Sequence, residues 1–362
     1  MHRRHFLTAL GAGAAGLAAA PFVSTARADE PITWKMVTSW PKNFPALGTG
    51  ANDLARRINE LSGGRLRVEV YGAGELVPAL EVFDAVSSGT AQMGHSASYY
   101  WRGKVPAAQM FTAVPFGMTT QETNAWLYQG EGQALWDALY EKHNLKPFAV
   151  GNTGTQMGGW FKREVNSLAD MQGLKLRLPG LAGEAMNGIG VTTLNLPGGE
   201  IFTSMQTGVL DAADWVGPYN DLAFGLHQVA DYYYTSAWNE PSAILEGTIN
   251  LDAWRALPDD LKVVVQEAAR SANQAMIDEF TLRNAEALKT LVEEHGVQLR
   301  QFPDDVMQAL YDSSRAVLAK QTEADEDSRR ILESYRAFQA LVRPFNDIGE
   351  FAYLKNREMV SG

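Results

Sequence analysis

The residues best placed for chemistry lie at the ends of predicted strands in the middle of the chain, and they favour binding of an anion. Arg177 stands near the C-terminal end of a predicted strand within Asp170–Gly180. Asp214 and Trp215 end another predicted strand, which follows a helix and Gly208. Ligands of open α/β sheets bind outside the carboxyl ends of strands, and an arginine there offers a planar fork to a carboxylate. Taken alone, Arg177 is also compatible with a solvated surface charge.

Signatures of catalysis are sparse in this sequence. The four histidines beyond residue 28 are scattered and match no metal-binding spacing such as H-E-x-x-H: His95, His143, His227 and His295. A G-x-S-x-G nucleophile elbow and a P-loop are both missing. The complete lack of cysteine excludes disulfides, thiolate zinc sites, iron–sulfur ligation and cysteine nucleophiles. An enzyme of this sequence would have to assemble its acid and base from distant segments.

The first 28 residues have the order of an export signal. Two adjacent arginines, Arg3 and Arg4, precede an apolar run over Phe6–Val23, and Ala26-Arg27-Ala28 supplies a small-residue cleavage site. The paired arginines followed by Phe-Leu resemble a twin-arginine signal peptide. A membrane anchor is the alternative, although the run is rich in Ala and Gly and lies at the short limit for a span. We therefore expect cleavage of residues 1–28 and residence in the periplasm.

The net charge of the chain is negative, which argues against some classes of binding partner. The chain has 31 basic and 42 acidic residues, a net charge of −11. Removal of residues 1–28 takes away three arginines and no acid, which leaves −14 over 334 residues. A nucleic-acid binder would carry a basic footprint, and an acidic surface also disfavours docking on anionic lipid. A small anionic ligand is still compatible, because one buried arginine outweighs the average field locally.

Helices and strands alternate along the chain, which is typical of α/β domains. The first block has predicted strands and helices at 32–38, 46–62, 66–71, 75–88 and 91–95. This order favours a largely parallel sheet. A second block with the same alternation starts near Phe148. Its predicted strands lie at 159–161, 174–178, 192–196 and 212–215, and its helices at 183–189 and 200–207.

The length of 362 residues favours two domains. Helical periodicity over residues 258–295 predicts one helix of about 50 Å, longer than a single domain, so we expect it to span both. Two α/β domains joined by several crossings form a hinged ligand cleft. The expected division is domain I at 29–150 plus about 240–275, domain II at 151–239 plus about 276–330, and C-terminal helices at 331–362.

The order of the motifs resembles the solute-binding proteins of tripartite ATP-independent periplasmic (TRAP) transporters, the DctP family. The family pattern G-L-K-x-R-x-P-G corresponds to Gly173–Gly180. The following pattern, E-x₅-Q-x-G-x₂-D-x₂-(E/D), corresponds to Glu200–Asp214. The resemblance extends over the chain beyond the signal, including Gly72–Leu76 and the long late helix. It implies an α/β fold like that of periplasmic binding proteins and a function in ligand capture without catalysis.

A narrower resemblance points to one class of ligand. The segments Gly151–Phe161, Asp214–Tyr219 and Tyr232–Tyr234 are similar to the branch that binds 2-oxo and 2-hydroxy monocarboxylates, such as pyruvate, lactate and longer 2-oxo acids. In that branch a metal ion lies beside the ligand carboxylate. The branch carries a glutamate at the position of Asp214, where the present side chain is one methylene shorter.

The resemblance implies a role for each candidate site residue. Arg177 is the carboxylate clamp, and the other substrate-binding candidates are Asn152, Gln156, Tyr99, Tyr100 and Trp215. The metal ligands are Gln156, Asp214, the main chain at Trp215, and Glu240. Such hard oxygen ligands suit Na⁺ or Ca²⁺ and not zinc, and a cation offsets the repulsion between two carboxylates and an anionic ligand. In the metal-free alternative, Asp214 pairs with Arg177 or with a lysine.

The resemblance also implies partners. A TRAP binding protein delivers its ligand to membrane subunits, and no apolar run after the signal reaches the length of a membrane span. In the 2-oxo-acid branch the C-terminal helices can exchange between two subunits, here over Ala337–Glu358, which implies a homodimer. Two alternatives are a periplasmic enzyme acting on an organic acid and a ligand sensor that presents its ligand to a receptor.

Overall fold

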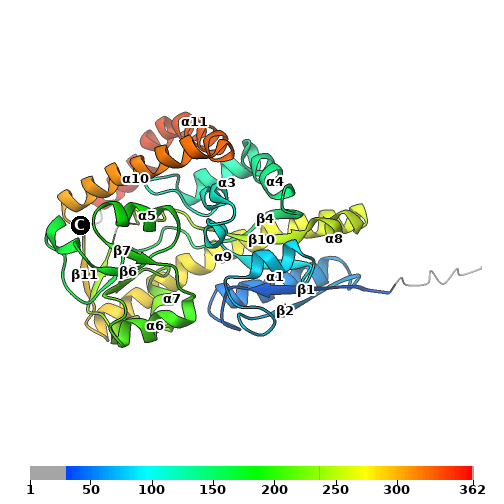
Figure 1. The fold of residues 1–362 in the computed structure, drawn as a ribbon, viewed down its shortest axis with the longest axis horizontal. Coiled ribbons are helices and arrows are strands. Elements are labelled where there is room, and N and C mark those ends of the chain that lie inside the picture. Colours follow the sequence, from blue (N-terminus) through cyan, green and yellow to red (C-terminus); the bar gives the residue numbers. More distant parts are fainter. Residues whose placement is uncertain (1–29, 236, 361–362) are drawn as a thin grey trace, which may run out of the picture. The chain divides into compact units, whose positions relative to one another are not determined.

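Two mixed β-sheets with surrounding helices make up the part of the chain that the structure describes (Figure 1). The structure is a computed structural model and describes residues 30–235 and 237–360. The predicted signal peptide at residues 1–28 lies outside these ranges. Within them, no helix is both long and apolar enough to cross a membrane.

The first sheet, sheet A, has the strand order β2-β1-β3-β10-β4. Its strands are β1 (Ile32–Thr38), β2 (Leu66–Tyr71), β3 (Met93–Ser96), β4 (Leu145–Asn152) and β10 (Ile244–Asn250). The pairings of β1 with β2 and β3 are parallel, as predicted. The expectation of a largely parallel sheet is wrong for β10, which runs antiparallel to both β3 and β4. The reason is that the chain returns from the second sheet at the edge where β3 and β4 end.

The second sheet, sheet B, has the order β11-β9-β5-β8-β6-β7. Its short strands are β5 (Gly159–Phe161), β6 (Lys175–Arg177), β7 (Thr192–Leu194), β8 (Ala212–Ala213), β9 (Tyr232–Tyr234) and β11 (Gln298–Arg300). The strand β6 is parallel to β7 and β8, whereas β5 is antiparallel to β8 and β9. Arg177 is paired with Ala213 in register. The end of β6 and Asp214 therefore share one sheet edge, as the sequence predicted.

The predicted helix at 75–88 is wrong over its first half. The structure has only α2 (Val82–Ser87), preceded by a turn. Gly74 has a φ of 84°, outside the helical region, and Pro78 disfavours a helical conformation for the residue before it. The Glu75 side chain accepts a hydrogen bond from the Gly72 amide at 2.8 Å. Local turn chemistry thus replaces the helix that apolar periodicity suggested.

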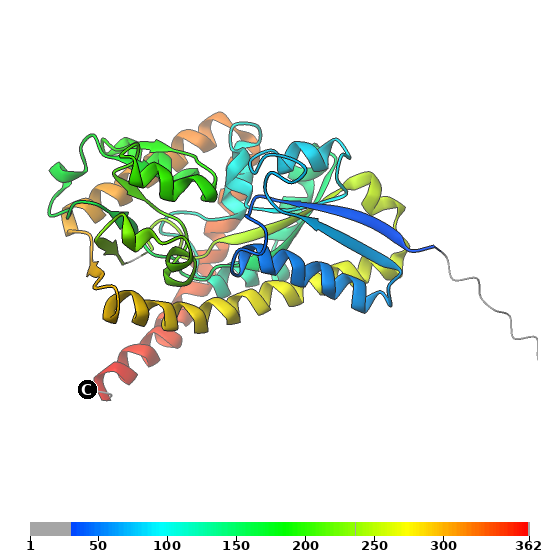
Figure 2. The same cartoon turned by 90° about the horizontal axis from the view of Figure 1, so that it is seen from below.

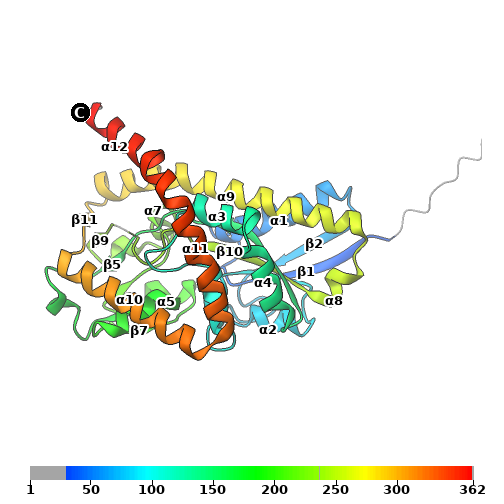
Figure 3. The same cartoon turned by 90° about the horizontal axis from the view of Figure 1, so that it is seen from above.

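The predicted long helix is confirmed as α9 (Asp259–Glu293), whose 35 residues span about 53 Å. Its first half packs against α1 (Leu47–Leu61) and sheet A, through Leu261, Val265 and neighbouring apolar residues. Its second half contributes Phe280, whose ring lies 6.3 Å from that of Tyr219 on α7 (Pro218–Ala223). The helix is seen along its length in Figures 2 and 3. It therefore connects the surroundings of both sheets.

The remaining helices complete the cover of the sheets. They are α3 (Thr120–Gln129), α4 (Gly132–Glu141), α5 (Gly180–Gly188), α6 (Gly198–Gln206), α8 (Leu251–Ala256), α10 (Asp304–Ala324), α11 (Glu326–Ile348) and α12 (Glu350–Val360). The last two of them, α11 and α12, contain the described part of the C-terminal helices predicted at 331–362 (Figure 3). A short 3₁₀ helix, Ser98–Trp101, follows β3.

Sheet A contains a buried carboxyl group, that of Glu246 on β10. One of its oxygens accepts hydrogen bonds from Ser98 Oγ and Tyr140 Oη, both at 2.7 Å. The Tyr140 hydroxyl in turn accepts one from Trp101 Nε1 at 2.9 Å. Burial raises the pKa of Glu246 to about 8, although these two donors act in the opposite direction. This side chain is therefore largely neutral at pH 7.

Glu246 should make the stability of the fold depend on pH. The unfolded chain releases this proton near pH 4.5 and the folded chain near 8, so the stabilising contribution is complete below 4.5 and is lost as the pH rises toward 8. Between pH 5 and 8 we expect the free energy of unfolding, measured relative to Glu246→Gln, to fall by about 1.4 kcal/mol per pH unit. Denaturant unfolding of both proteins measures the difference, and a difference independent of pH contradicts the prediction.

Candidate functional site

Arg177 lies at the centre of a buried polar cluster between the two sheets. Its side chain is fully buried, which excludes the surface-charge interpretation. Nε donates to the Leu196 carbonyl at 3.1 Å, and Nη1 donates to the Asp214 carbonyl at 2.9 Å. Nη2 lies 3.3 Å from the Tyr100 hydroxyl, and the guanidinium stacks on the Trp215 ring at 5.1 Å. Strand β6, its neighbour β8 and the Ser98–Trp101 helix together fix its direction.

The Arg177 guanidinium has no carboxylate within ion-pair distance among residues 30–235 and 237–360. The predicted metal-free alternative, an ion pair of Asp214 with Arg177 or a lysine, is therefore wrong for these ranges. Three of the five guanidinium N–H groups are used, by two main-chain carbonyls and a tyrosine. Because an uncompensated buried charge is costly, this arrangement suits a ligand that brings a negative charge.

Aromatic side chains from both sheets enclose the guanidinium. Tyr99 and Tyr100 are both buried on the 3₁₀ helix after β3, with their rings edge to face at 4.9 Å. The Trp40 ring lies 6.1 Å from that of Tyr100 and 6.2 Å from that of Trp215. Trp40 follows β1, whereas Trp215 follows β8. The walls of the cluster therefore come from the two sheets together, and burial raises the pKa of both tyrosines.

Three predicted metal ligands each have one buried oxygen without a hydrogen-bond partner in the described part of the chain. These atoms are Gln156 Oε1, Asp214 Oδ2 and Glu240 Oε2. The other side-chain polar atoms of Gln156 and Asp214 are engaged: Gln156 Nε2 donates to Thr153 Oγ1 at 3.0 Å, and Asp214 Oδ1 accepts from Asn239 Nδ2 at 3.2 Å. The main-chain N–H of Gln156 donates to the main-chain carbonyl of Glu240 at 3.2 Å, which joins the two chain segments that carry these residues.

If both carboxyl groups were ionised, they would carry more negative charge than Arg177 can offset. Burial raises the pKa of Asp214 to about 7, against the attraction of the Arg177 charge, and Asp221 adds to the rise. Burial also raises the pKa of Glu240 well above its ordinary value, and the charge on Asp214 raises it further. Each group therefore opposes ionisation of the other, and a cation beside them would relieve this repulsion.

The donor set fits the kind of cation that the sequence predicted. The unpartnered atoms are one amide and two carboxylate oxygens, which are ligands for Na⁺ or Ca²⁺. No group of three His, Cys, Asp or Glu side chains suited to a metal occurs in the described ranges. The candidate ligands are instead a mixed set of amide, carboxylate and main-chain oxygens.

Asn152 lies at the end of β4, where both of its side-chain polar atoms are engaged. Nδ2 donates to Ser242 Oγ at 2.9 Å, and Oδ1 accepts from the Gly154 amide at 2.9 Å. Its observed contacts join the two segments that cross between the sheets. A direct contact of Asn152 with ligand stays a prediction.

Three residues of the cluster were missed by sequence reasoning. Asn239 holds one Asp214 oxygen, Trp40 bridges the aromatic walls, and Asp221 lies behind the loop that follows β8. Asn239 directly precedes a predicted ligand, and Trp40 lies two residues after a predicted strand, so position in the sequence could have suggested both. Nothing in the sequence distinguished Asp221 from the many surface acids.

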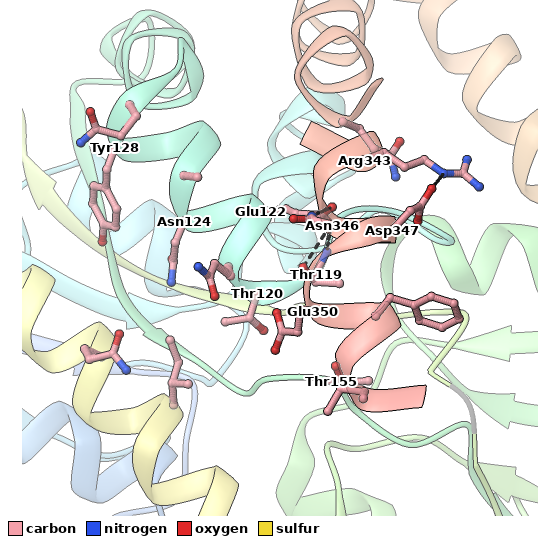
Figure 4. A pocket seen from close by; sticks show the side chains of 18 of the residues that line it. Thr119, Thr120, Glu122, Asn124, Tyr128, Thr155, Arg343, Asn346, Asp347 and Glu350 are labelled. Atoms are coloured by element: carbon pink, nitrogen blue, oxygen red, sulfur yellow. Dashed lines mark hydrogen bonds and ion pairs between the residues drawn. The ribbon is translucent and has the colours of Figure 1, made fainter. Parts of the chain in front are cut away.

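A separate groove of about 1100 Å³ lies among α3, α9, α11 and α12 (Figure 4). Its wall includes Glu122, which accepts a hydrogen bond from Asn346, and Thr155, which donates to the Pro241 carbonyl at 3.1 Å. Thr155 is adjacent to Gln156, but Arg177 and the unpartnered oxygens do not line the groove. The groove is therefore distinct from the buried cluster.

Comparisons with known proteins agree on one family. A model of bacterial extracellular solute-binding proteins, family 7 (DctP), matches residues 36–325. A monocarboxylate 2-oxoacid-binding periplasmic protein of Nostoc sp. is 41% identical over 324 residues, which cover 89% of this chain and 88% of the relative.

Solved structures of TRAP solute-binding proteins are similar in fold and sequence. One from Pseudoalteromonas atlantica, with bound sodium and pyruvate, has a TM-score of 0.88 and 39% identity and covers 90% of this chain and 99% of its own. One from Bordetella bronchiseptica has a TM-score of 0.89 and 33% identity, with coverages of 92% and 98%. The latter is a mixed-occupancy dimer with calcium and picolinate in a bound site and a second, apo site.

Glu240→Gln should stabilise the protein in the absence of cations. The amide removes both the repulsion with Asp214 and the cost of burying a second carboxyl group, so at pH 8 we expect a gain of about 1–3 kcal/mol in the free energy of unfolding. Because the folded pKa is raised, the gain should grow as the pH rises. Thermal and denaturant unfolding in chelator at low sodium measure it.

A matched control for this substitution is Glu267→Gln on the exposed face of α9, which should leave stability within about 0.5 kcal/mol of wild type. Added Ca²⁺ should raise the melting temperature of the wild type more than that of Glu240→Gln. A Glu240→Gln protein that is less stable than wild type in chelator would show that the two carboxyl groups do not destabilise the cation-free state.

Proposed function

Because the chain belongs to family 7 of the bacterial extracellular solute-binding proteins, we propose that it captures a small 2-oxo or 2-hydroxy monocarboxylate and presents it to TRAP membrane subunits. Pyruvate, lactate and longer 2-oxo acids share the carboxylate with an adjacent oxygen. The observation that carries the proposal is the buried Arg177, without a carboxylate partner in the described ranges, beside three unpartnered buried oxygens. The similarity to proteins solved with pyruvate or picolinate supports it.

In this proposal Arg177 binds the ligand carboxylate with its remaining N–H groups. Its two bonds to main-chain carbonyls hold the fork in place before the ligand arrives, which lowers the ordering cost of binding. Tyr99, Tyr100 and Trp215 form the aromatic wall, and Asn152 and Gln156 supply amide groups. Closure of these walls excludes water and strengthens each charged hydrogen bond.

Gln156, Asp214, Glu240 and the main chain at Trp215 would hold a Na⁺ or Ca²⁺ ion next to the ligand. The ion supplies positive charge that lets two carboxylates and an anionic ligand share one buried site. The three unpartnered oxygens support this assignment, since each otherwise bears a desolvation cost without a partner. The calcium or sodium of the similar solved proteins supports the choice of ion.

We also propose the domain division that the sequence suggested, with a hinge between the domains. Domain I comprises 29–150 plus about 240–275, domain II comprises 151–239 plus about 276–330, and the C-terminal helices follow. The contact between Tyr100 and Arg177 would then cross the cleft, and Asn152 would lie at a hinge strand. Opening would break the first contact while the main-chain bonds of Arg177 stay in place.

The route of export and the fate of the ligand complete the proposal. The arginine pair in residues 1–28 assigns export to the twin-arginine pathway, followed by cleavage and release into the periplasm. The protein binds its ligand and does not transform it. Ligand recovered unchanged after prolonged incubation with the protein would support binding without catalysis, and turnover would contradict it.

Arg177→Ala should abolish tight binding of the ligand. Removal of one partner of a buried charge-assisted pair costs about 2–5 kcal/mol. Calorimetry with pyruvate, in Ca²⁺ or Na⁺ and again in chelator, measures this loss. In wild type, removal of the cation should also weaken binding, because the carboxyl groups then repel the ligand.

The control for Arg177→Ala is Arg177→Lys, which keeps the positive charge and loses the planar fork. We expect Lys to lose less affinity than Ala and to keep the wild-type near-ultraviolet circular dichroism. Near-wild-type affinity of the alanine variant would contradict the role of Arg177. A panel of monocarboxylates in a thermal-shift assay then ranks the ligands, since only ligands bound by the folded state raise its melting temperature.

We further propose that the C-terminal helices, residues 331–362, mediate a homodimer. Leu341, Phe345 and Ile348 on α11 are 76%, 74% and 77% exposed and lie at helical spacing on one face. Phe351 on α12 extends this apolar surface at 64% exposure. Such an exposed patch is typical of a protein interface, and the groove of Figure 4 adjoins it. The dimer of the Bordetella protein supports the proposal.

Phe345→Asp should convert the dimer to a monomer, because a carboxylate would be buried without a partner at the interface. Light scattering coupled to gel filtration measures the mass in solution. Leu61→Asp is the matched control: Leu61 is 57% exposed at the end of α1, far along the chain from the proposed interface, and should not alter the mass. A wild-type protein that is monomeric at micromolar concentration would overturn the proposal.

A further inference from the structure

Asp221 on α7 is a buried carboxylate whose two oxygens accept four hydrogen bonds. Oδ1 accepts from the main-chain amides of Val216 at 3.1 Å and Gly217 at 3.2 Å. Oδ2 accepts from Trp160 Nε1 at 2.9 Å and from Tyr233 Oη at 2.7 Å. Its side chain is 1% exposed, and no Lys, Arg or His of the described chain lies within ion-pair distance. The carboxylate therefore acts purely as an acceptor that joins two parts of the protein.

The first part is the loop that follows β8, and the bond to Val216 fixes its geometry. The peptide unit between Trp215 and Val216 is planar and trans, since the described chain contains no cis peptide bond. In such a unit the N–H and C=O groups point in opposite directions. Because Asp221 holds the Val216 N–H, the carbonyl of Trp215 must point away from Asp221. Rotation of this peptide would break the bond.

The same reasoning applies to the next peptide. The Gly217 N–H points to Asp221, and the Val216 carbonyl, on the opposite side, accepts a hydrogen bond from the Met157 amide at 3.1 Å. That contact connects the loop to the segment that carries Gln156. Two successive peptide planes of the loop are thus fixed in orientation, and both depend on one carboxylate oxygen.

The second part is the rigid sheet behind the loop. Trp160 on β5 and Tyr233 on β9 are both fully buried, and their rings stack at 4.1 Å. Both strands are paired in sheet B. The two ring donors therefore hold Asp221 at a fixed position, and Asp221 transmits this position to the loop.

We propose that Asp221 is a positioning residue that aims the Trp215 carbonyl at the cation site. The inference rests on the proposed function, in which that carbonyl is the main-chain cation ligand beside Asp214. Asp221 touches neither ligand nor cation and acts only through the peptide between Trp215 and Val216. Without this anchor the peptide rotates, and a water takes the place of the carbonyl at the ion.

Asp221→Asn tests the proposal, because an amide of the same shape cannot accept from both sides. Its nitrogen would face either the Trp160 and Tyr233 donors or the two loop amides. We expect Ca²⁺ affinity, measured by calorimetry at pH 7.4 on chelator-treated protein, to fall about tenfold. With Tb³⁺ as a luminescent probe in place of Ca²⁺, the lifetimes in H₂O and D₂O should report one more bound water than in wild type.

The matched control is Glu246→Gln, which converts another buried carboxyl group to an amide within sheet A. It should leave the number of waters on Tb³⁺ unchanged and Ca²⁺ affinity within twofold, whatever its stability. Tyr233→Phe, which removes one anchoring donor and keeps the carboxylate, should weaken Ca²⁺ binding about two- to threefold. That variant serves as the test if Asp221→Asn does not fold.

The water count separates a positioning role from a general loss of stability. Asp221→Asn with a wild-type water count and an unchanged Ca²⁺ affinity would overturn the inference, as would an unchanged affinity of Tyr233→Phe if only that variant folds. A wild-type protein that binds neither Ca²⁺ nor Tb³⁺ would instead contradict the proposed function. The two failures are therefore distinguishable.

Discussion

The structure depends on one unusual constraint, a fully buried guanidinium without a carboxylate partner in the described ranges. Two main-chain carbonyls hold Arg177, which means that the backbone at Leu196 and Asp214 must present them at the right distance. The register of β6 with β8 positions the Asp214 carbonyl, and the chain beyond β7 positions the Leu196 carbonyl. Tyr100 then approaches from the other sheet. One positive charge therefore organises groups that lie far apart in the sequence, at the place where the two sheets meet.

Buried acids are treated in three different ways in this protein. Glu246 is buried in sheet A with two hydroxyl donors, and its raised pKa favours a neutral side chain. Asp221 has four donors and fixes a loop to a sheet. Asp214 and Glu240 each retain an unpartnered oxygen and disfavour each other's ionisation. Glu246 Oε1 is unpartnered as well, so what sets Asp214 and Glu240 apart is that the two carboxyl groups oppose each other's ionisation beside Arg177. The hydrogen-bond donors and charges around each buried acid thus distinguish the acids that support the fold from the acids suited to binding.

The acidic total of the chain does not conflict with an anionic ligand. Surface charges are screened by water and salt, whereas a charge in a buried site interacts through a much lower dielectric. The immediate environment of Arg177 consists of carbonyls, aromatic rings and a hydroxyl. The surface excess of acids influences solubility and the docking partner, and the short-range geometry controls what binds inside.

Local patterns in the sequence determined the strands, the long helix and the sheet edge at which Arg177 and Asp214 meet, because periodicity and turn residues act over a few positions. The motif resemblance determined the family and suggested the ligand set. Tertiary structure alone decided the direction of β10, the turn that replaced the helix before α2, and the burial of Arg177. It alone also revealed the roles of Asn239, Trp40 and Asp221. These roles depend on contacts between residues that in some cases lie more than a hundred positions apart in the sequence. They also depend on which polar atoms remain unpaired after packing. Neither property is encoded in a local sequence pattern.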